Sequence, residues 1–450
     1  MFAKIKTAIG ISEVVGIAIP VIILVFALSG MELTKRPDSG SYIVFADSIL
    51  SGDLFEKKDL NDISFGRAVR TPGYPLIVAL AKLTSSDFIS SLKLLHFVFG
   101  IFSIVFLSLV LKPWLPPIAT GLSIVFVDIR MGVYFGNIMT EWVAFNLLLV
   151  LVGLVVIGFR NPSNRNLCII GLLASFIVLV RPAVIPVMLI LPMLVIYRRR
   201  LGIKDAILFV STLLPLIAWM SFNLYHLDSF ALGRVSGHNI FGIGTMIGYA
   251  EEEPGDSDEL REFIRGVNAK KTPAVGDEDE FVANFDEEYH TIRLTSNLFW
   301  IAYPLRIEGM GAIPFDEQYL AVYGRRAIND HLDNYISYVL HGLKVSVQFV
   351  SPYLTLYLLL IPLFALYRNR RAVLAWVALV MFAIHTGQVF LIAVFQTIFF
   401  RYLELTFYPY VGTIILCFLA LLFAEGIPER ILGWLPRPLR SVVGPLIRVG

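Results

Sequence analysis

The sequence predicts an all-α protein that crosses a membrane many times, and three observations support this class. Of the 450 residues, 57% are hydrophobic and only 16% are charged, a balance unlike that of soluble domains. Apolar runs with few interior charges recur along the whole chain, several of them close to the roughly 20 residues that a helix needs to cross hydrocarbon. Basic residues gather in alternate short loops between these runs, which is typical of a polytopic chain.

About ten apolar runs predict membrane spans. We place them near residues 14–30, 91–111, 115–129, 140–158, 166–180, 183–197, 206–225, 345–366, 372–393 and 404–424. The first run is expected to be an uncleaved anchor. The runs that flank Arg181-Pro182 are short for two full crossings, so a re-entrant hairpin is the alternative for that pair.

Lysine and arginine in the short loops set the orientation, because positively charged loops stay in the cytoplasm. Both termini fall on that side with the basic positions Lys4, Lys6, Lys112, Arg160, Arg165, Arg198 to Arg200, Lys204, Arg368, Arg370, Arg371, Arg430, Arg437 and Arg440. Two long loops, about 31–90 and 226–342, then face outside. The chain therefore divides into an N-terminal membrane module (1–225), an outer loop (226–342) and a C-terminal membrane module (343–450).

The first outer loop predicts two helices at the membrane surface. In SYIVFADSILS, apolar and polar residues take opposite faces of a helix, and Gly52 supplies a C-terminal stop. The following RAVRTPGYPLIVALA contains an apolar run too short to span, which should hold Arg67 and Arg70 close to lipid phosphates. Contact with lipid head groups alone is the other interpretation of these arginines.

The second outer loop predicts a small helical subdomain. Asp256, with Glu259 three residues later, forms a capping-box pattern at a helix start. Residues 315–349 predict one or two long helices that lead into the eighth span. The acidic runs of this loop indicate a solvated surface rather than a calcium site.

Ionisable residues at the ends of spans are functional candidates, because a charge in or near hydrocarbon is costly. They are Asp128, Arg130, Glu141, Arg181, Lys344, Arg401 and Glu404, and the predicted topology puts all of them at the outer surface. A transporter would be expected to hold its substrate charges near the bilayer midplane. The pattern instead favours an enzyme whose active site opens at the outer interface and takes a lipid-linked substrate sideways from the leaflet.

Several short motifs follow one another along the chain. Asp38, Tyr42, Ala46 and Gly52 have the form D-x3-Y-x3-A-x5-G, and RTPGYP, MTEW, VRPAV, NLYHLDSFALGRVSGHNIFGIG and FRYLELTFYPYV follow. Together they resemble the GT-C glycosyltransferases over about residues 14–424. The resemblance is strongest to the polyprenyl-phosphate-sugar-dependent branch related to protein O-mannosyltransferases and lipid A aminoarabinose transferases. RTPGYP departs from the Lys-Pro-Pro-Leu motif of the aminoarabinose transferases, so that subgroup's donor sugar is not carried over.

The resemblance implies a GT-C type bundle and an enzyme that moves a sugar, with inversion, from polyprenyl phosphate to a hydroxyl-type acceptor outside the membrane. It also implies Asp38 as general base, and Glu141 is a second catalytic candidate. Because arginine matches phosphate oxygens in pairs, Arg70 and Arg401, then Arg181 and Arg67, are expected to bind the donor phosphate. Tyr42, Tyr74 and Tyr402 are expected to position the substrate. The partners would be the lipid-linked donor, the bilayer and a lipid, glycan or protein acceptor. Nothing indicates nucleic-acid binding.

Alternatives stay open at several of these positions. Asp38 could be only the N-cap of the interfacial helix, and Glu141 could simply pair with Arg130. We expect no cofactor, although Asp38, Asp128 and Glu141 could converge on a divalent ion. The alternative functions are an O-antigen polymerase or ligase, which joins whole glycans, and a lipid or polysaccharide transporter without chemistry.

Overall fold

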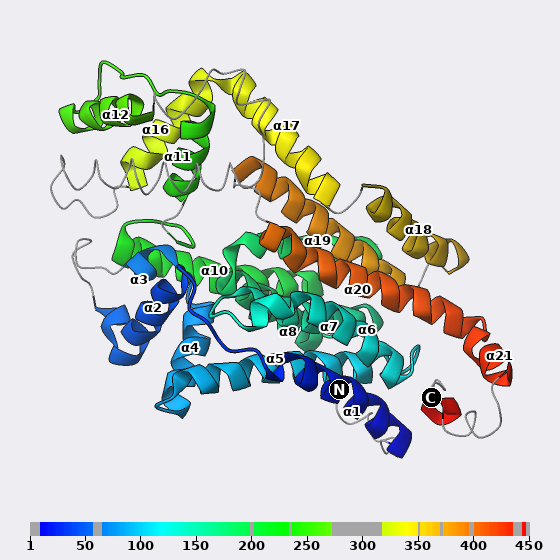
Figure 1. The fold of residues 1–450 in the computed structure, drawn as a ribbon. Helices are drawn as coiled ribbons and strands as arrows, with labels where there is room; N and C mark the ends of the chain where they lie inside the picture. The colour runs from blue at the N-terminus through cyan, green and yellow to red at the C-terminus, as the bar shows by residue number, and fades with distance from the viewer. Residues whose placement is uncertain are drawn as a thin grey trace.

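The structure is a computed structural model that describes residues 10–56, 65–198, 202–233, 236–271, 317–349, 352–369, 372–395, 400–434 and 443–446. Within these ranges the regular structure is helical, with one isolated β-bridge between Thr34 and Asn137. The predicted all-α class is therefore confirmed. Long helices lie side by side and connect the two ends of the molecule (Figure 1).

The helices are named as in Figure 1. The first half of the chain forms α1 (Ile11–Ser29), α2 (Ser39–Ser51), the 3-10 helix η2 (Asp53–Phe55), α3 (Phe65–Val69), α4 (Gly73–Thr84), α5 (Phe88–Leu111), α6 (Pro117–Phe135), α7 (Glu141–Arg160), α8 (Asn164–Val180), the 3-10 helix η4 (Pro182–Leu189), α9 (Ile190–Arg198) and α10 (Ile203–Leu227). The second half forms α11 (Ser236–Ile247), α12 (Asp258–Lys271), α16 (Glu317–Asp330), α17 (Leu332–Phe349), α18 (Pro352–Arg368), α19 (Val373–Phe395), α20 (Phe400–Ala424) and α21 (Ile427–Trp434).

Seven helices in the described part of the chain are long and apolar enough to cross a membrane: α1, α5, α6, α7, α10, α19 and α20. The predicted runs 166–180, 183–197 and 345–366 correspond to shorter helices, α8, η4 with α9, and α18. The third predicted span, 115–129, was drawn too short, because α6 continues to Phe135. Asp128 and Arg130 consequently lie inside α6 rather than at its end.

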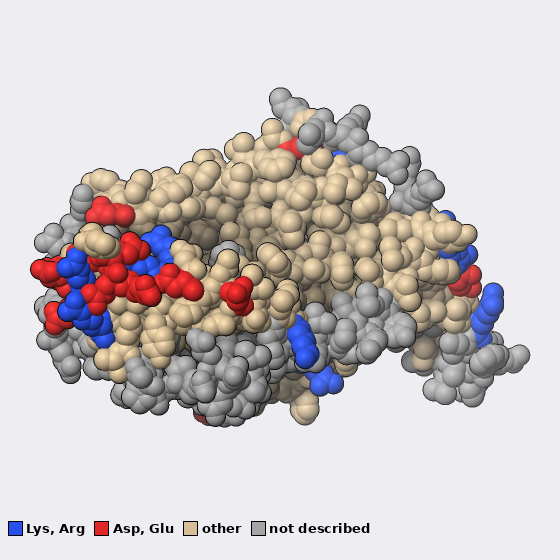
Figure 2. All heavy atoms as spheres, turned by 90° about the horizontal axis from the view of Figure 1, so that it is seen from above, with Lys and Arg blue, Asp and Glu red and all other residues tan. Residues whose placement is uncertain are grey.

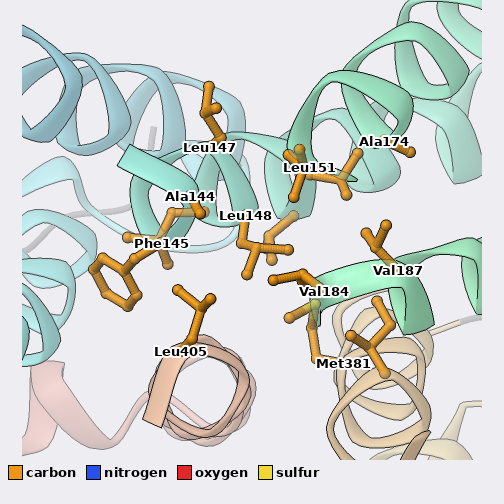
Figure 3. Packing of buried hydrophobic residues seen from close by; sticks show 14 of the residues in the cluster. Ala144, Phe145, Leu147, Leu148, Leu151, Ala174, Val184, Val187, Met381 and Leu405 are labelled. Atoms are coloured by element: carbon orange, nitrogen blue, oxygen red, sulfur yellow. The ribbon is translucent and has the colours of Figure 1, made fainter. Parts of the chain in front are cut away.

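The centre of the bundle is α7, whose apolar stretch is 94% buried. Its side chains are apolar on all faces, as expected for a helix enclosed by other helices. Figure 3 shows Leu148 of α7 lying among side chains from three neighbours, Val184 of η4, Met381 of α19 and Leu405 of α20. Helix α7 is thus the common packing partner of both membrane modules.

The outer helices of the bundle expose apolar side chains, which indicates a lipid-facing surface. On α6, for example, Phe126 and Val133 are 51% and 64% exposed. In Figure 2, acidic and basic residues are most numerous at the left end of the face, a smaller group lies at the right end, and the surface between them carries few charges. This distribution supports the predicted membrane protein.

Within residues 226–342, helices α11, α12 and α16 pack around a hydrophobic cluster of their own, called the outer subdomain below after its predicted location. Helices α11 and α16 approach so closely that a Cβ on Gly244 would lie 2.7 Å from the Cα of Gly324. The prediction that Asp256 caps α12 was wrong: the helix begins at Asp258, and the backbone N–H of Leu260 donates to the Ser257 hydroxyl. Asp256 instead accepts two hydrogen bonds of 2.6 Å from the guanidinium of Arg326 on α16.

The interfacial helices α2, α3 and α4 pack together at one end of the bundle, and glycines permit two of the contacts. A Cβ on Gly66 would lie 2.2 Å from the carbonyl oxygen of Ser41, so α3 can approach α2 this closely only at a glycine. A Cβ on Gly73 would lie 2.5 Å from the backbone nitrogen of Val180. The glycine of the RTPGYP motif therefore places the start of α4 directly against the end of α8.

Substitution Gly73→Ala is expected to destabilise the protein by about 1–3 kcal/mol, because backbone on α8 cannot yield to the added methyl group as a side chain could. The measurement is the free energy of unfolding in detergent. Gly40→Ala is the control, since nothing lies within 4 Å of a Cβ there. Equal stability of the two variants would contradict the proposed backbone contact.

The outer subdomain should loosen in acid. Hydrogen bonds from the Arg326 guanidinium lower the pKa of Asp256 from 3.8 to about 2. A carboxylate with a depressed pKa stabilises the folded state above its ordinary pKa, and this contribution is lost as the pH falls toward the depressed value. Amide exchange in α12 and α16 should be slower in the wild type than in Asp256→Asn at about pH 5, and the two should converge as the pH approaches 2. The exposed Asp258→Asn serves as control; a wild-type advantage that persists unchanged at pH 2 would contradict the assignment.

Candidate functional site

The first outer loop is fastened to the loop between α6 and α7. Thr34 and Asn137 form a parallel β-bridge, in which the Thr34 N–H donates to Gly136 O at 2.8 Å and the Ile138 N–H donates to Thr34 O at 3.1 Å. The Ser39 hydroxyl adds a hydrogen bond of 2.8 Å to the carbonyl of Ile138. These bonds bring the first residues of α2 and α7, and with them Asp38 and Glu141, to the same corner of the bundle.

Asp38 forms an ion pair with Arg70. The Arg70 Nη2 donates to the Asp38 Oδ1 at 2.7 Å, and its Nε donates to the Ser41 hydroxyl at 2.9 Å. The guanidinium also lies over the ring of Tyr42, 4.7 Å from its centroid, a favourable cation–π geometry. Side-chain exposures of 35% for Asp38 and 23% for Arg70 leave this pair open to solvent.

Asp38 occupies the N-cap position of α2, yet its side chain makes no capping hydrogen bond. The Ser41 hydroxyl donates to its backbone carbonyl instead. The carboxylate is directed to Arg70, so the N-cap interpretation does not account for this side chain.

Glu141 and Arg181 form a second ion pair, deeper in the protein. Arg181 Nη1 lies 3.1 Å from Glu141 Oε1, and the two side chains are 7% and 0% exposed. The Thr140 hydroxyl accepts a hydrogen bond from Arg181 and lies 3.5 Å from Glu141 Oε2. The alternative pairing of Glu141 with Arg130 is not observed among the described contacts.

Pro182 explains the placement of Arg181. A residue before proline is driven out of the helical region, and Arg181 is extended, with φ −147° and ψ 98°. Helix α8 ends there, and Gly73 packs against its last turn. The VRPAV and RTPGYP motifs therefore act together to direct a guanidinium into the bundle.

Tyr42 contacts the first ion pair through the Arg70 guanidinium and is influenced by the charges of the second. Burial raises the pKa of its phenol, while the charges of Arg70 and Arg181 oppose that shift and those of Glu141 and Asp38 add to it. All four charged groups are thus within electrostatic reach of one hydroxyl. The Tyr42 phenol is consequently neutral near pH 7 and able to donate a hydrogen bond.

The ring of Tyr74 packs against the ring of Tyr42. Their rings meet edge to face, with centroids 5.2 Å apart, an arrangement that aromatic pairs favour. The Tyr74 hydroxyl lies 3.4 Å from Nε2 of the buried His96, whose Nδ1 lies 3.1 Å from the carbonyl of Phe135. A column of rings therefore connects the site to the core of the bundle.

The remaining predicted site residues lie elsewhere or outside the described side chains. Arg67 is buried and donates to the carbonyls of Asp53, Leu54 and Glu56 at 2.9, 2.7 and 3.2 Å. Its Nη2 also lies 3.2 Å from Nδ1 of His226, so its guanidinium fastens the chain after α2. Arg401 and Tyr402 belong to the first turn of α20, but their side chains are outside the described part of the structure.

The structure adds a residue that the sequence reasoning missed. Tyr134 of α6 donates a hydrogen bond of 2.5 Å to Glu404 Oε2 of α20, and the charges of Glu141 and Arg181 act on its hydroxyl. Its position was hidden because the third span was ended at residue 129. A phenol in the last turn of an apolar helix was the available signal.

The acids considered for a metal site do not converge. Asp38 and Glu141 are each paired with an arginine, and Asp128 is fully buried within α6. The described residues include no group of three His, Cys, Asp or Glu side chains that could hold a metal ion. The expectation of a cofactor-free site remains a prediction.

Comparisons with known proteins were made for sequence and for fold. No protein-family model and no curated protein matches the chain. Among solved structures, the chain is similar to ArnT from Cupriavidus metallidurans in the apo state, with 12% identity and a TM-score of 0.34 over 90% of this chain and 76% of that chain. It is also similar to ArnT bound to undecaprenyl phosphate, with 14% identity and a TM-score of 0.35 over 94% of this chain and 80% of that chain.

Substitution Arg181→Met should lower the free energy of unfolding by about 3–5 kcal/mol, because it leaves the Glu141 charge buried without its cation. The double variant Glu141→Leu with Arg181→Met should recover most of this loss, since both charges are then replaced by apolar groups. Unfolding in detergent measures both effects.

The control is the Asp47–Lys82 pair, where Asp47 is 57% exposed; Lys82→Met should cost less than about 1 kcal/mol. An equal loss in the single and double variants would show that the buried pair is not an energetic unit.

Proposed function

We propose that the protein is a GT-C type membrane glycosyltransferase that moves a sugar from a polyprenyl-phosphate donor to a hydroxyl-type acceptor. The observation that carries the proposal is the pair of arginine–carboxylate contacts, Asp38–Arg70 and Glu141–Arg181, that flank Tyr42 at one end of an apolar bundle. Such a site combines two arginines that could bind a phosphate with a carboxylate, that of Asp38, which solvent can reach. All five of these side chains lie in the motifs that resemble the GT-C family, which supports the proposal.

The arginines suit the leaving group. When a glycosidic bond to phosphate breaks, negative charge grows on the phosphate oxygens and must be stabilised. Guanidinium groups match phosphate oxygens in bidentate geometry. We assign Arg70 and Arg181 to the donor phosphate, with Arg401 as a further candidate on α20. Arg67 is left out, because its donors serve backbone carbonyls.

Asp38 is the proposed general base. Its side chain is the more exposed carboxylate of the two pairs, so an acceptor hydroxyl can reach it. The acceptor oxygen forms a bond to the anomeric carbon while the bond from that carbon to the phosphate oxygen breaks. The electron pair leaves with the phosphate, and Asp38 takes the hydroxyl proton. Attack opposite the leaving group inverts the anomeric centre.

Glu141 receives a different role from the one predicted. Its side chain is 0% exposed and lies against Arg181, so a substrate proton has no path to it in this arrangement. We propose that Glu141 orients Arg181 toward the phosphate. Tyr42, neutral and adjacent to both pairs, is assigned to a hydrogen bond with the substrate, and Tyr74 holds its ring in place.

The site should face the outside of the membrane. The start of α1 lies at the end opposite to α2 (Figure 1), and there Glu13 meets Lys112 of the α5–α6 loop with an N–O distance of 2.5 Å. The basic short loops of this end are the type retained in the cytoplasm. A polyprenyl-linked donor would then reach the site laterally from the outer leaflet.

The test compares purified wild type, Asp38→Asn and Asp47→Asn in lipid, with labelled polyprenyl-phosphate sugars. Wild type and Asp47→Asn should release sugar at the same rate, because Asp47 lies on the same helix but pairs with Lys82. Asp38→Asn should be slower by about 100-fold or more, as expected for loss of a general base. Addition of a chelator should leave the wild-type rate unchanged.

Two results would reject the proposal. A wild type that consumes no donor of the panel excludes the transferase and favours transport without chemistry. Full activity in Asp38→Asn removes Asp38 from the reaction even if a donor is consumed.

A further inference from the structure

Helices α6 and α20 are joined by a hydrogen bond next to the proposed site. The Tyr134 hydroxyl donates to Glu404 Oε2 at 2.5 Å, and both side chains are partly buried. Tyr134 lies in the last turn of α6, and its carbonyl accepts a hydrogen bond of 3.2 Å from the N–H of Asn137, the residue bridged to Thr34. Glu404 therefore lies at the corner where α6 ends and the loop leading to Glu141 begins. Helix α20 also packs directly on α7, which carries Glu141.

Glu404 differs from the other carboxylates of this region. Asp38 and Glu141 each face a guanidinium. In the part of the chain that the structure describes, Glu404 enters no ion pair, and its hydrogen bond comes from a neutral phenol. An ionised carboxylate has about four acceptor positions, and Tyr134 uses one of them. The rest are suited to further hydrogen-bond donors.

Neighbouring aromatic groups extend this surface. Tyr408, one turn after Glu404 on α20, feels the charges of both Glu404 and Arg130. The Tyr134–Glu404 hydrogen bond thus lies where α6 and α20 pack together, close to the end of α6 that joins the α7 loop. Glu404 and Tyr408 belong to the FRYLELTFYPYV motif, whereas Tyr134 lies outside the quoted motifs.

We propose that Glu404 binds ring hydroxyls of the donor sugar and that Tyr134 holds its carboxylate in place. The inference rests on the proposed function, because it takes Arg181 to bind the donor phosphate. That phosphate is attached to the anomeric carbon, so a carboxylate at the same corner as Arg181 is placed to meet the sugar ring in this proposal. Sugar hydroxyls are hydrogen-bond donors, and a carboxylate without a cation accepts from them in preference to binding phosphate oxygens.

This role makes Glu404 a determinant of donor choice. A site built to hydrogen-bond a particular hydroxyl discriminates strongly against an analogue that lacks it, because its own polar group is then left unpaired. The arginines recognise the phosphate that all such donors share. The hydroxyl pattern of the sugar would be recognised at the seam between α6 and α20.

The experiment combines a substitution in the protein with the removal of a hydroxyl from the substrate, as in a double-mutant cycle. Donor hydrolysis without an acceptor is measured for the full sugar and for a series of deoxy donors, in wild type and in Glu404→Gln. One deoxy position should lower the wild-type kcat/KM by roughly 10- to 100-fold, whereas the same deletion should change that of Glu404→Gln by less than about threefold. The loss should lie mainly in KM, because the hydroxyl is already bound in the ground state.

Two further variants complete the design. Glu425→Gln, just past the far end of α20, removes a carboxylate that pairs with Arg368 and should keep the wild-type pattern. Tyr134→Phe leaves the carboxylate but removes its support, so it should lose part of the same discrimination; it takes over the test if Glu404→Gln does not fold.

The outcomes separate the inference from the function on which it rests. Equal losses in wild type and Glu404→Gln at every deoxy position would overturn the role of Glu404 while the transferase stands. A dependence on Glu404 that arises only when an acceptor is present would assign it to the acceptor and overturn the proposal as stated. Absence of hydrolysis of every donor by the wild type would reject the proposed function and this inference with it.

Discussion

The buried contact between Glu141 and Arg181 is the constraint on which the rest of the site depends. Two charges in an apolar bundle are tolerated only when each meets the other with good geometry. Here the anion is the first residue of α7 and the cation is the residue after α8, so both helices must end at the same depth. Arg181, which is extended before Pro182, and the contact of Gly73 with the end of α8 both lie where the two helix ends meet. They therefore help to hold the two charges at the same depth.

Sequence reasoning predicted much of this arrangement and missed parts for physical reasons. The helical class, the interfacial helix ended by Gly52 and the candidate charges Asp38, Arg70 and Arg181 were all readable from periodicity, turn chemistry and motifs. The sequence did not show which side chains are buried. Arg67 and Arg70 look equivalent in the sequence, yet Arg67 binds backbone carbonyls and Arg70 binds the carboxylate of Asp38. The end of α6 was misplaced because charged residues were taken to mark the membrane boundary, whereas Asp128 is enclosed by protein. The Tyr134–Glu404 contact joins residues 270 positions apart, which no local pattern encodes.

The two ion pairs at the start of α2 and α7 differ in how deeply they are buried, and we expect them to have different roles. Exposed Asp38 with Arg70 forms the accessible part of the site, and enclosed Glu141 with Arg181 forms the rigid part. Tyr42 connects them, supported through Tyr74 by the buried His96. For the proposed donor, which is anionic at its phosphate and rich in hydroxyls elsewhere, each portion would meet side chains from a different helix, so the positions of the helices would determine its recognition.

Helix α7 is enclosed on all sides although it is apolar enough to stand alone in lipid. Moving such a helix from lipid to protein gains little from the hydrophobic effect, so close packing and polar contacts must hold it there. Its packing partners include α5, which precedes it in the chain, and α19 and α20, which follow it. Glu141 meets its cation only when the end of α8 lies beside the start of α7, because Arg181 follows α8 directly. A chain in which α8 is misplaced would therefore leave an unpaired carboxylate among apolar helices, a defect that disfavours wrong arrangements of the bundle.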